Sequence, residues 1–311
     1  MGKIKLIIGS RGSELALWQA NYVKKELERK NKNLSVEIKI VKTKGDKLQK
    51  AALFKIGDKG LFTKELENEL LECSIDIAVH SLKDLQTEIP EGLKLAAVTK
   101  RHYVEDVLIA RKKGMTIFDL KENATVATGS LRRKSQLLHL RPDLKIEELR
   151  GNVPTRIKRF FESTWDAIIL ARAGIERLNL QKHISSIIPT DQILPAVGQG
   201  ALAIEIRNLN RFAEELIQPI HDENTFAAVT AERELLKNLQ GGCQVPIGAF
   251  AHTENNGLFL ESFVGSSDGR ISFKTKMRGS KNNPKSLGNK VAQALINAGA
   301  NEILNEIYSK R

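Results

Sequence analysis

Short apolar runs alternate with segments of helical periodicity from Lys3 to Ile206. Strands that alternate with helices are typical of an α/β sheet. The pattern therefore predicts an α/β fold for the first two thirds of the chain. The expected strands cover residues 4–8, 36–40, 75–79, 93–98, 107–110, 125–127, 145–148, 167–170 and 201–206.

Two polar residues are expected to begin helices. Ser13 precedes an amphipathic stretch whose apolar face includes Ala20 and Leu27, and its side chain is of a type that caps helix N-termini. Asn152 precedes a second stretch, with Pro154 in its first turn, where proline fits a helix.

So many strands in about 200 residues indicate two α/β lobes. The whole chain of 311 residues also exceeds the size at which one hydrophobic core keeps growing, so more than one domain is expected. We expect breaks near residues 100–104 and 195–200, and two crossings imply a hinge. The predicted domains are residues 1–99 with 200–218, residues 100–199, and residues 219–311.

The pattern changes after Asp222. A helix through Asn238 is followed by strands at 247–251, 258–264 and 271–277, and then by a helix at 285–298. Consecutive strands flanked by helices predict a separate, small α+β domain.

Composition adds a strong positive charge to this picture. The 311 residues carry a formal net charge of +12, with 41% hydrophobic and 28% charged residues. Such a protein attracts polyanions: nucleic acid, a membrane surface, or a small substrate rich in carboxylates or phosphates. Only 5% of the residues are aromatic, which supplies base stacking poorly. No stretch approaches the ~18 apolar residues of a membrane helix.

The two cysteines lie far apart, at Cys73 and Cys243, and no CxxC spacing indicates a disulfide or zinc site. A reducing cytoplasm fits best. Cys73 ends an amphipathic pattern and is expected in the core. Cys243 lies in Gly241-Gly242-Cys243-Gln244-Val245-Pro246, where no regular element is expected. That context favours a thiol presented for chemistry over a small buried hydrophobe.

Arginines recur where an expected strand meets an expected helix. The junctions are Ser10-Arg11-Gly12-Ser13, Thr128-Gly129-Ser130-Leu131-Arg132-Arg133 and Leu149-Arg150-Gly151-Asn152-Val153-Pro154-Thr155-Arg156. Arginines in a helix's first turn oppose its dipole unless an anion lies there too. One such arginine is readily explained as solvated, but three junctions together favour an anion site. The planar fork of arginine suits carboxylates.

The segment His80-Ser81-Leu82-Lys83-Asp84 follows the expected strand 75–79. Ligands of open α/β sheets bind beyond the carboxyl ends of strands, so this segment is a candidate site. A solvated surface pair of Lys83 and Asp84 is the alternative.

Two other motifs are rejected. Gly198-Gln199-Gly200 follows Pro195 and precedes a strand-like run, whereas a dinucleotide fingerprint needs a strand before it and a helix after it. The six histidines show no metal-ligand spacing, so no metal is expected. A hydrolase that pairs Cys243 with His80 remains open on residue types alone.

Taken together, six motifs closely resemble the porphobilinogen deaminase (hydroxymethylbilane synthase) family. They follow one another in order over nearly the whole chain. They are Ile8-Gly9-Ser10-Arg11, His80-Ser81-Leu82-Lys83-Asp84, Ser130-Leu131-Arg132-Arg133, Arg150-Gly151-Asn152, Pro195-Ala196-Val197-Gly198-Gln199-Gly200 and Gly241-Gly242-Cys243-Gln244-Val245-Pro246-Ile247-Gly248.

The resemblance implies a fold and an activity. Two lobes would be like those of type 2 periplasmic binding proteins, with a small α+β domain carrying the cofactor loop. Cys243 would hold a dipyrromethane primer by a thioether. Four porphobilinogen molecules are deaminated and added head to tail, and hydrolysis then releases hydroxymethylbilane, a precursor in tetrapyrrole and heme biosynthesis.

The resemblance also assigns the residues. Asp84 is catalytic, because its charge stabilises a cationic intermediate and its oxygens accept pyrrole N–H bonds or a proton. Each pyrrole carries an acetate and a propionate, which gives the arginines a ligand. Ser13, Lys83, Ser130, Arg132 and Arg133 would bind the cofactor, and Arg11, Arg150, Arg156 and Arg177 the substrate.

Three positions depart from the family's usual pattern. Gly129 stands where serine is common, and Pro154 and Asp58 each replace a frequent glycine. Asp58 weakens the case that Lys55 and Lys59 contact the growing chain.

The expected substrate is porphobilinogen. The protein is expected to be a cytoplasmic monomer that binds neither nucleic acid nor a membrane. The competing function is a two-lobed polyanion-binding protein without chemistry, which shares the arginines but leaves Asp84 no task.

Overall fold

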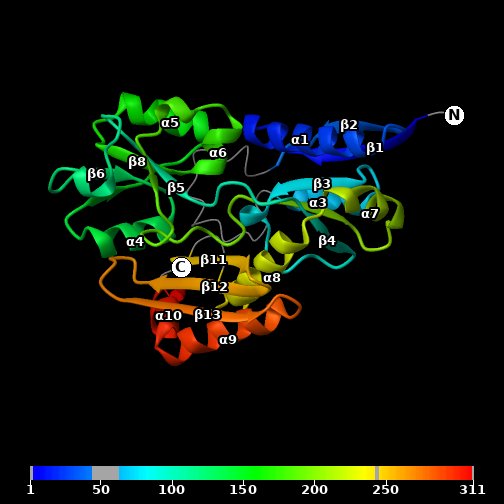
Figure 1. The fold of residues 1–311 in the computed structure, drawn as a ribbon. Coiled ribbons are helices and arrows are strands. Elements are labelled where there is room, and N and C mark those ends of the chain that lie inside the picture. Colours follow the sequence, from blue (N-terminus) through cyan, green and yellow to red (C-terminus); the bar gives the residue numbers. More distant parts are fainter. Residues whose placement is uncertain (1–2, 44–62, 242–244, 310–311) are drawn as a thin grey trace. The chain divides into compact units, whose positions relative to one another are not determined.

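The computed structural model describes residues 3–43, 63–241 and 245–309 (Figure 1). Contacts between Cα atoms divide the chain into two units. Unit 1 comprises Met1–His102 and Gly200–Phe226, and unit 2 comprises Tyr103–Gln199 and Ala227–Arg311. The division into three domains stays a prediction.

Unit 1 is built on a five-stranded sheet of order β2-β1-β3-β10-β4. β1 runs parallel to β2 and β3, whereas β10 runs antiparallel to β3 and β4. Leu6 and Ile8 of β1 are fully buried, as the apolar pattern predicts. The elements are β1 (Ile4–Ser10), α1 (Glu14–Lys30), β2 (Leu34–Ile40), α3 (Lys64–Leu71), β3 (Ile77–Ser81), η2 (Leu82–Asp84), β4 (Leu93–Val98), β10 (Leu202–Arg207), α7 (Arg211–Ile217) and η5 (Gln218–Ile220).

Unit 2 contains a second five-stranded sheet, of order β7-β6-β8-β5-β9. β6 runs parallel to β7 and β8, and β5 runs antiparallel to β8 and β9. The elements are β5 (Asp106–Ala110), η3 (Ile117–Asp119), β6 (Thr125–Ala127), α4 (Leu131–Leu140), β7 (Lys145–Glu147), α5 (Val153–Glu162), β8 (Ala167–Ala171), α6 (Arg172–Arg177), η4 (Gln181–His183) and β9 (Ser186–Ile188).

The two sheets share one topology. In each, three parallel strands are followed by an antiparallel strand and then by an outer strand. The antiparallel strands, β5 and β10, each follow a chain crossing between the units, at His102–Tyr103 and at Gln199–Gly200. This arrangement confirms the expected fold class of two α/β lobes. The short strand β9 was not expected.

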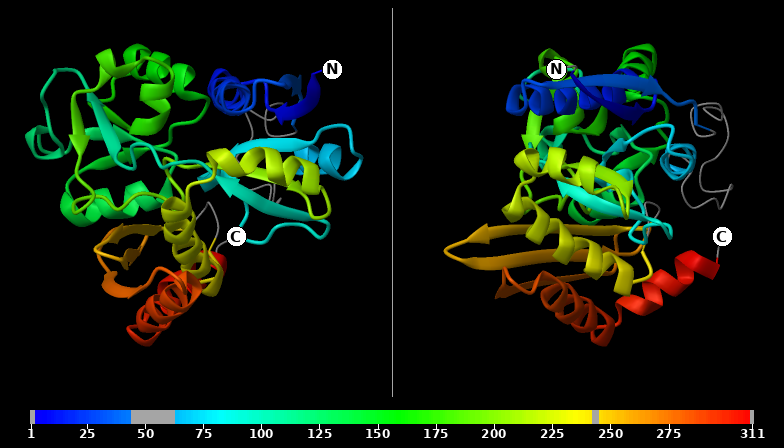
Figure 2. Two further views of the ribbon diagram at one scale, coloured as in Figure 1. Left: turned by 45° about the vertical axis from the view of Figure 1, so that its right-hand side comes forward. Right: turned by 90° about the vertical axis from the view of Figure 1, so that its right-hand side faces the viewer.

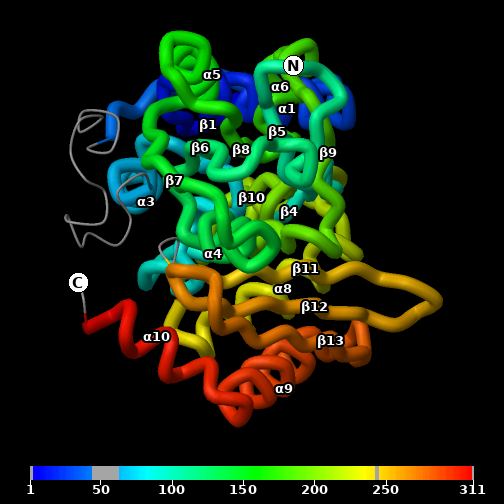
Figure 3. The backbone as a smooth tube through the Cα atoms, turned by 90° about the vertical axis from the view of Figure 1, so that its left-hand side faces the viewer, coloured from blue at the N-terminus to red at the C-terminus, as the bar shows by residue number. Residues whose placement is uncertain are grey.

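The C-terminal region of unit 2 forms a three-stranded antiparallel sheet. Helices α9 and α10 pack against this sheet (Figure 2). The turn between β12 and β13 lies beside α4 (Figure 3), where a Cβ on Gly269 would lie 2.5 Å from the backbone nitrogen of His139. This confirms the small α+β region; only α10 was not expected. The elements are α8 (Glu223–Asn238), β11 (Ile247–Glu254), β12 (Gly257–Gly265), β13 (Ser272–Ser280), α9 (Pro284–Asn297) and α10 (Ala300–Ser309).

The expectation that Cys73 lies in the core is wrong, because its side chain is exposed. Helix α3 buries Leu66 and Leu70 but ends at Leu71. Cys73 lies just past this end with a φ of 58°, a left-handed conformation that often terminates helices. The apolar periodicity therefore continues past the end of the helix.

Candidate active site

In unit 1, the junction between β1 and α1 is held by two serines. Ser13 caps α1 as expected, and its hydroxyl accepts a hydrogen bond from the Ala16 nitrogen at 3.3 Å. The buried Ser10 hydroxyl donates to the Ala16 carbonyl at 3.2 Å. Arg11, between them, is half-buried. The hydroxyl of Ser13 thus already has a structural role beside the predicted cofactor contact.

Asp84 lies at the end of the short helix η2, directly after β3. Leu82 and Leu85 on either side are buried, and the Leu82 nitrogen donates to the Ala201 carbonyl at 3.1 Å. Asp84 itself is exposed and forms no hydrogen bond or ion pair with any residue of the described chain. The backbone is therefore fixed while the carboxylate stays available.

The ends of β1 and β3 lie at the same edge of the sheet, because these neighbouring strands are parallel. Gln19 of α1 donates to the Ser81 hydroxyl at 2.7 Å and so joins α1 to the end of β3. The structure thus brings the segments carrying Arg11, Ser13, Lys83 and Asp84 to one edge of unit 1.

His80 is buried and paired with another side chain of the protein interior. It is 6% exposed, and its Nε2 lies 3.0 Å from Oε2 of the fully buried Glu205. Burial raises the pKa of the nearby Glu67, and the charge of Glu205 adds to this rise. His80 is therefore part of an interior polar cluster rather than a base presented to a thiol.

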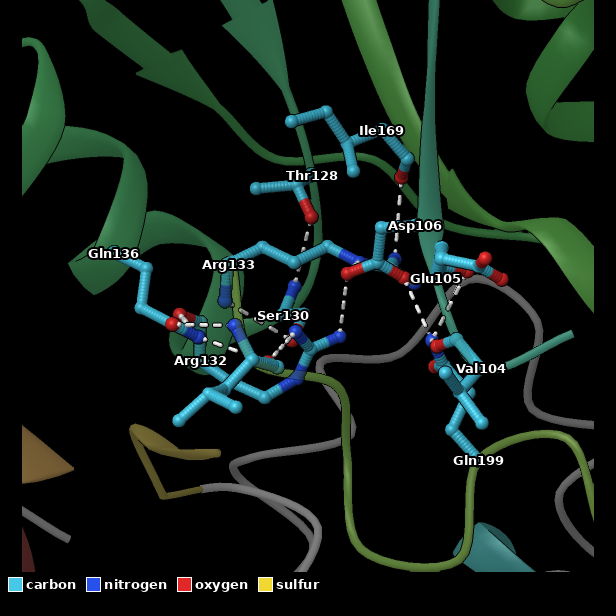
Figure 4. Close-up of polar contacts among 11 residues, drawn as sticks. Val104, Glu105, Asp106, Thr128, Ser130, Arg132, Arg133, Gln136, Ile169 and Gln199 are labelled. Carbon is cyan, nitrogen blue, oxygen red and sulfur yellow. Dashed lines mark hydrogen bonds and ion pairs between the residues drawn. The ribbon is translucent and has the colours of Figure 1, made fainter. Parts of the chain in front are cut away.

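In unit 2, the junction between β6 and α4 turns its arginines inward (Figure 4). Ser130 caps α4 and accepts from the Arg133 nitrogen at 3.5 Å. Arg132 and Arg133 are 4% and 5% exposed, and both donate to the carboxylate of Asp106, which is fully buried. An anion therefore does bind the arginines at this helix N-terminus, and in the structure it is the carboxylate of Asp106.

Asp106 lies in no motif that the sequence singled out, and no local pattern indicated that Gln199 contacts it. The Gln199 amide donates to Asp106 Oδ1 at 2.9 Å and to the Val104 carbonyl at 2.6 Å (Figure 4). The available signal was an acidic residue at the start of an otherwise apolar strand. Such a charge is rarely buried unless it is paired.

The junction between β7 and α5 carries the next two candidate arginines. Asn152 caps α5 as expected, accepting from the Thr155 nitrogen at 2.9 Å. Arg150 pairs with Glu148, and the Arg156 Nε donates to the Gly151 carbonyl at 2.6 Å. Because β6 and β7 are parallel neighbours, this junction and Ser130 share one sheet edge. Arg177 is buried at the end of α6.

Gly129 is explained by this close approach of the two junctions. A Cβ at position 129 would lie 2.6 Å from the Leu149 carbonyl oxygen, a backbone atom that cannot turn aside. The departure from serine therefore follows from local packing in this chain.

An anionic cofactor fits the cluster in unit 2. Two guanidinium groups share one carboxylate, which leaves one unit of positive charge in the interior. The buried Nε of Arg132 has no hydrogen-bond partner in the described chain. A buried donor without an acceptor costs about 1–3 kcal/mol. A ligand acetate or propionate is of the right charge and type to offset this cost.

Some predicted residues lie outside the described residues: Cys243, Lys55, Asp58 and Lys59. The residues that flank Cys243 are well packed, since Leu239 and Val245 are buried. A Cβ on Gly241 would lie 2.4 Å from Leu236 Cδ1, which accounts for one glycine of the pair.

Gly198 and Gly200 adopt positive φ values of 72° and 91° in a turn that leads into β10. A strand, β10, follows these glycines, whereas a dinucleotide-binding motif needs a helix there. In the described residues no group of His, Cys, Asp or Glu side chains is placed to hold a metal ion. Nor does any described helix combine the length and apolarity needed to cross a membrane.

Among solved structures, the chain is similar to a TRAP periplasmic solute binding protein from Desulfovibrio salexigens, with 10% identity, 71% and 73% of the two chains covered and a TM-score of 0.42. It is also similar to the periplasmic VFT2 domain of BvgS from Bordetella pertussis, with 15% identity, 69% and 84% coverage and a TM-score of 0.40.

Similarity to curated proteins is much stronger. The chain is 48% identical to a porphobilinogen deaminase of Chlorobium phaeobacteroides and 50% identical to one of Chloroherpeton thalassium, with 98% of both chains covered in each case. A porphobilinogen deaminase of Carboxydothermus hydrogenoformans is 48% identical with the same coverage.

Two family models cover most of the sequence. Residues 6–215 match the porphobilinogen deaminase dipyrromethane cofactor binding domain, and residues 226–297 match the porphobilinogen deaminase C-terminal domain. The chain belongs to the porphobilinogen deaminase family.

Proposed function

We propose that the chain is a hydroxymethylbilane synthase, a transferase that joins four porphobilinogen molecules head to tail and releases hydroxymethylbilane by hydrolysis. Asp84 carries this proposal. Its exposed carboxylate has no partner in the described chain, although the nearby Leu82 and Leu85 are buried and their backbone nitrogens are hydrogen-bonded. A fixed backbone with an available carboxylate is what repeated acid–base chemistry requires.

Loss of ammonia from porphobilinogen leaves an electron-poor carbon that a pyrrole α-carbon attacks. The negative charge of Asp84 stabilises the positive charge that develops on the substrate. Its oxygens accept a hydrogen bond from the pyrrole N–H and then take the proton that leaves the attacking α-carbon. The same carboxylate serves each addition, because the reacting groups repeat with every unit.

The dipyrromethane cofactor, when bound, supplies the first pyrrole α-carbon for chain growth. We assign its thioether to Cys243 and its carboxylates to Lys83, Ser130 and Arg132. The partnerless Nε of Arg132 and the excess positive charge of its cluster support this assignment.

Porphobilinogen brings one acetate and one propionate with each unit, so the bound chain becomes more anionic as it grows. Arg11, Arg150, Arg156 and Arg177 are assigned to these carboxylates. The net charge of +12 supports this role, since it favours an anionic substrate over the whole surface.

The test is intact mass spectrometry of the purified protein. Wild type should exceed its sequence mass by one dipyrromethane, and Cys243→Ser should lack that excess and fail to consume porphobilinogen. Cys73→Ser is the matched control, since Cys73 is exposed and has no assigned role. An unmodified wild type that still converts porphobilinogen would overturn the proposal.

The alternative, a two-lobed polyanion-binding protein without chemistry, shares the fold and the arginines. This alternative does not explain why the carboxylate of Asp84 is exposed and without a partner in the described chain. We also propose that the enzyme is a cytoplasmic monomer, which cell fractionation and sedimentation of the purified protein test directly.

A further inference from the structure

Asp106 is a carboxylate that two arginines share in the interior of unit 2. Arg133 donates through Nε to Oδ2 at 3.0 Å and through Nη2 to Oδ1 at 2.8 Å, and Arg132 donates through Nη2 to Oδ2 at 2.8 Å. Burial acts to raise the pKa of Asp106, but the charges of Arg132 and Arg133 outweigh it and lower the pKa well below its ordinary value. Asp106 is therefore ionised under all ordinary conditions.

The two arginines differ in how many of their nitrogens have hydrogen-bond partners. Arg133 uses all three of its nitrogens inside the protein, because its Nη1 also donates to the Ile169 carbonyl at 3.1 Å. Arg132 uses Nη1 on the Leu194 carbonyl at 2.6 Å and Nη2 on Asp106, and its Nε has no partner in the described chain. Among the six guanidinium nitrogens of the pair, Arg132 Nε is therefore the one without a hydrogen-bond partner in the described chain.

Gln199 holds Asp106 from the other side. Its amide nitrogen lies 2.9 Å from Asp106 Oδ1 and 2.6 Å from the Val104 oxygen (Figure 4). Residues 104 and 199 stand at the two ends of the first segment of unit 2, Tyr103–Gln199. One amide thus joins both ends of this segment to the carboxylate that orients the arginines.

Charge sets what the cluster can bind. The shared carboxylate cancels one of the two guanidinium charges, so one positive charge remains. A buried charge is costly unless it is paired, so the cluster favours one ligand carboxylate and disfavours two. Without Asp106, two uncompensated guanidinium groups would repel each other and lose their fixed direction.

We propose that Asp106 and Gln199 are positioning residues that leave the arginine pair with one positive charge and direct Arg132 toward a single carboxylate of the bound pyrrole chain. Arg133 holds Asp106 in place through its two hydrogen bonds to the carboxylate. This inference rests on the proposed function, because it takes the ligand to be a pyrrole carboxylate.

The first test is Gln199→Leu, with Gln181→Leu as the matched control at an exposed site of the same unit. Gln199→Leu removes the hydrogen bonds of the side-chain amide to Val104, Glu105 and Asp106 and leaves the charge unchanged. The dipyrromethane mass should be retained while KM for porphobilinogen rises about tenfold and kcat changes less. A lower Tm with wild-type KM would mean that Gln199 only stabilises the fold, and would overturn its positioning role.

The second test is Asp106→Asn, which leaves two buried guanidinium charges. Citrate should then raise the Tm of this variant more than it raises the Tm of wild type, because an anion binds the folded variant more tightly. An equal rise would overturn the claim that Asp106 sets the charge. If the variant does not fold, Gln199→Leu still decides the inference.

These outcomes are separate from failure of the proposed function. If wild type and Gln181→Leu both lack the cofactor mass and do not consume porphobilinogen, the proposed function is wrong. If both are active and Gln199→Leu matches them in KM, only the positioning inference is wrong.

Discussion

Arg133 and Asp106 face each other through two parallel hydrogen bonds, with Nε 3.0 Å from Oδ2 and Nη2 2.8 Å from Oδ1. Bidentate pairs of this kind are among the strongest and most directional ion pairs in proteins. Here the pair lies in the interior and also receives Arg132. One carboxylate therefore determines where two candidate ligand-binding arginines point.

Asp106→Asn should lower the free energy of unfolding by about 3–5 kcal/mol, because removing one partner of a buried pair leaves uncompensated charge. Urea unfolding monitored by circular dichroism measures the loss. Glu162→Gln is the control, since its pair with Lys158 is exposed and should contribute less than about 1 kcal/mol. Equal effects of the two substitutions would contradict the account of the cluster.

Glu67→Gln should stabilise the protein near neutral pH but not in acid. The pKa of Glu67 is raised by burial and then by the charge of Glu205, so the folded state favours the protonated carboxyl. Its burial therefore costs nothing below the ordinary pKa of 4.5 and costs progressively more as the pH rises through the higher folded value.

Thermal unfolding of wild type and Glu67→Gln across a pH series measures this difference. The Tm of the variant should exceed that of wild type by a few degrees near neutral pH, and the excess should vanish toward pH 4. A difference that does not vary with pH would mean that Glu67 is charged without penalty.

Ser13 can be tested for its two roles separately. Ser13→Ala should cost about 1 kcal/mol of stability by removing the cap of α1, whereas Ser13→Asp should keep the cap. The added carboxylate next to Arg11 should raise KM for porphobilinogen several-fold by repelling its carboxylates. Steady-state kinetics with a wild-type KM for Ser13→Asp would show that no substrate or cofactor carboxylate lies there.

Gly129→Ser restores the residue that is common in the family and should nevertheless destabilise this chain. Its Cβ would lie 2.6 Å from the Leu149 carbonyl oxygen, and such overpacking costs about 1–3 kcal/mol. Gly12→Ser is the control, because its Cβ would meet only the Ile40 side chain at 3.3 Å. Urea unfolding that ranks the two variants equally would contradict the packing argument.

Much of the fold was predictable from local pattern. The nine strands expected before residue 210 are present, because each combines β-branched residues with polar boundaries. Ser13 and Asn152 cap their helices because short polar side chains favour that position. The strand β9 was missed, since three residues ending at Ile188 carry too little periodicity. Cys73 was misplaced because the apolar pattern outlasts helix α3.

The candidate site was predictable only as far as residues close in sequence define it. Arg132 and Arg133 follow Ser130 in the chain, so their junction could be recognised. Their partner Asp106 is 26 residues from Arg132, and Gln199 is 93 residues from Asp106. Such pairings depend on how β5 and the segment before β10 fold together, which no local pattern reports.

Asp84 is the residue on which the proposed chemistry depends most, because each addition requires its charge. Asp84→Asn keeps the shape and removes the charge. The decisive measurement is the rate of porphobilinogen consumption by Asp84→Asn protein that carries the dipyrromethane mass. We predict a fall of about 100-fold or more with that mass retained. Wild-type turnover by this variant would contradict the account.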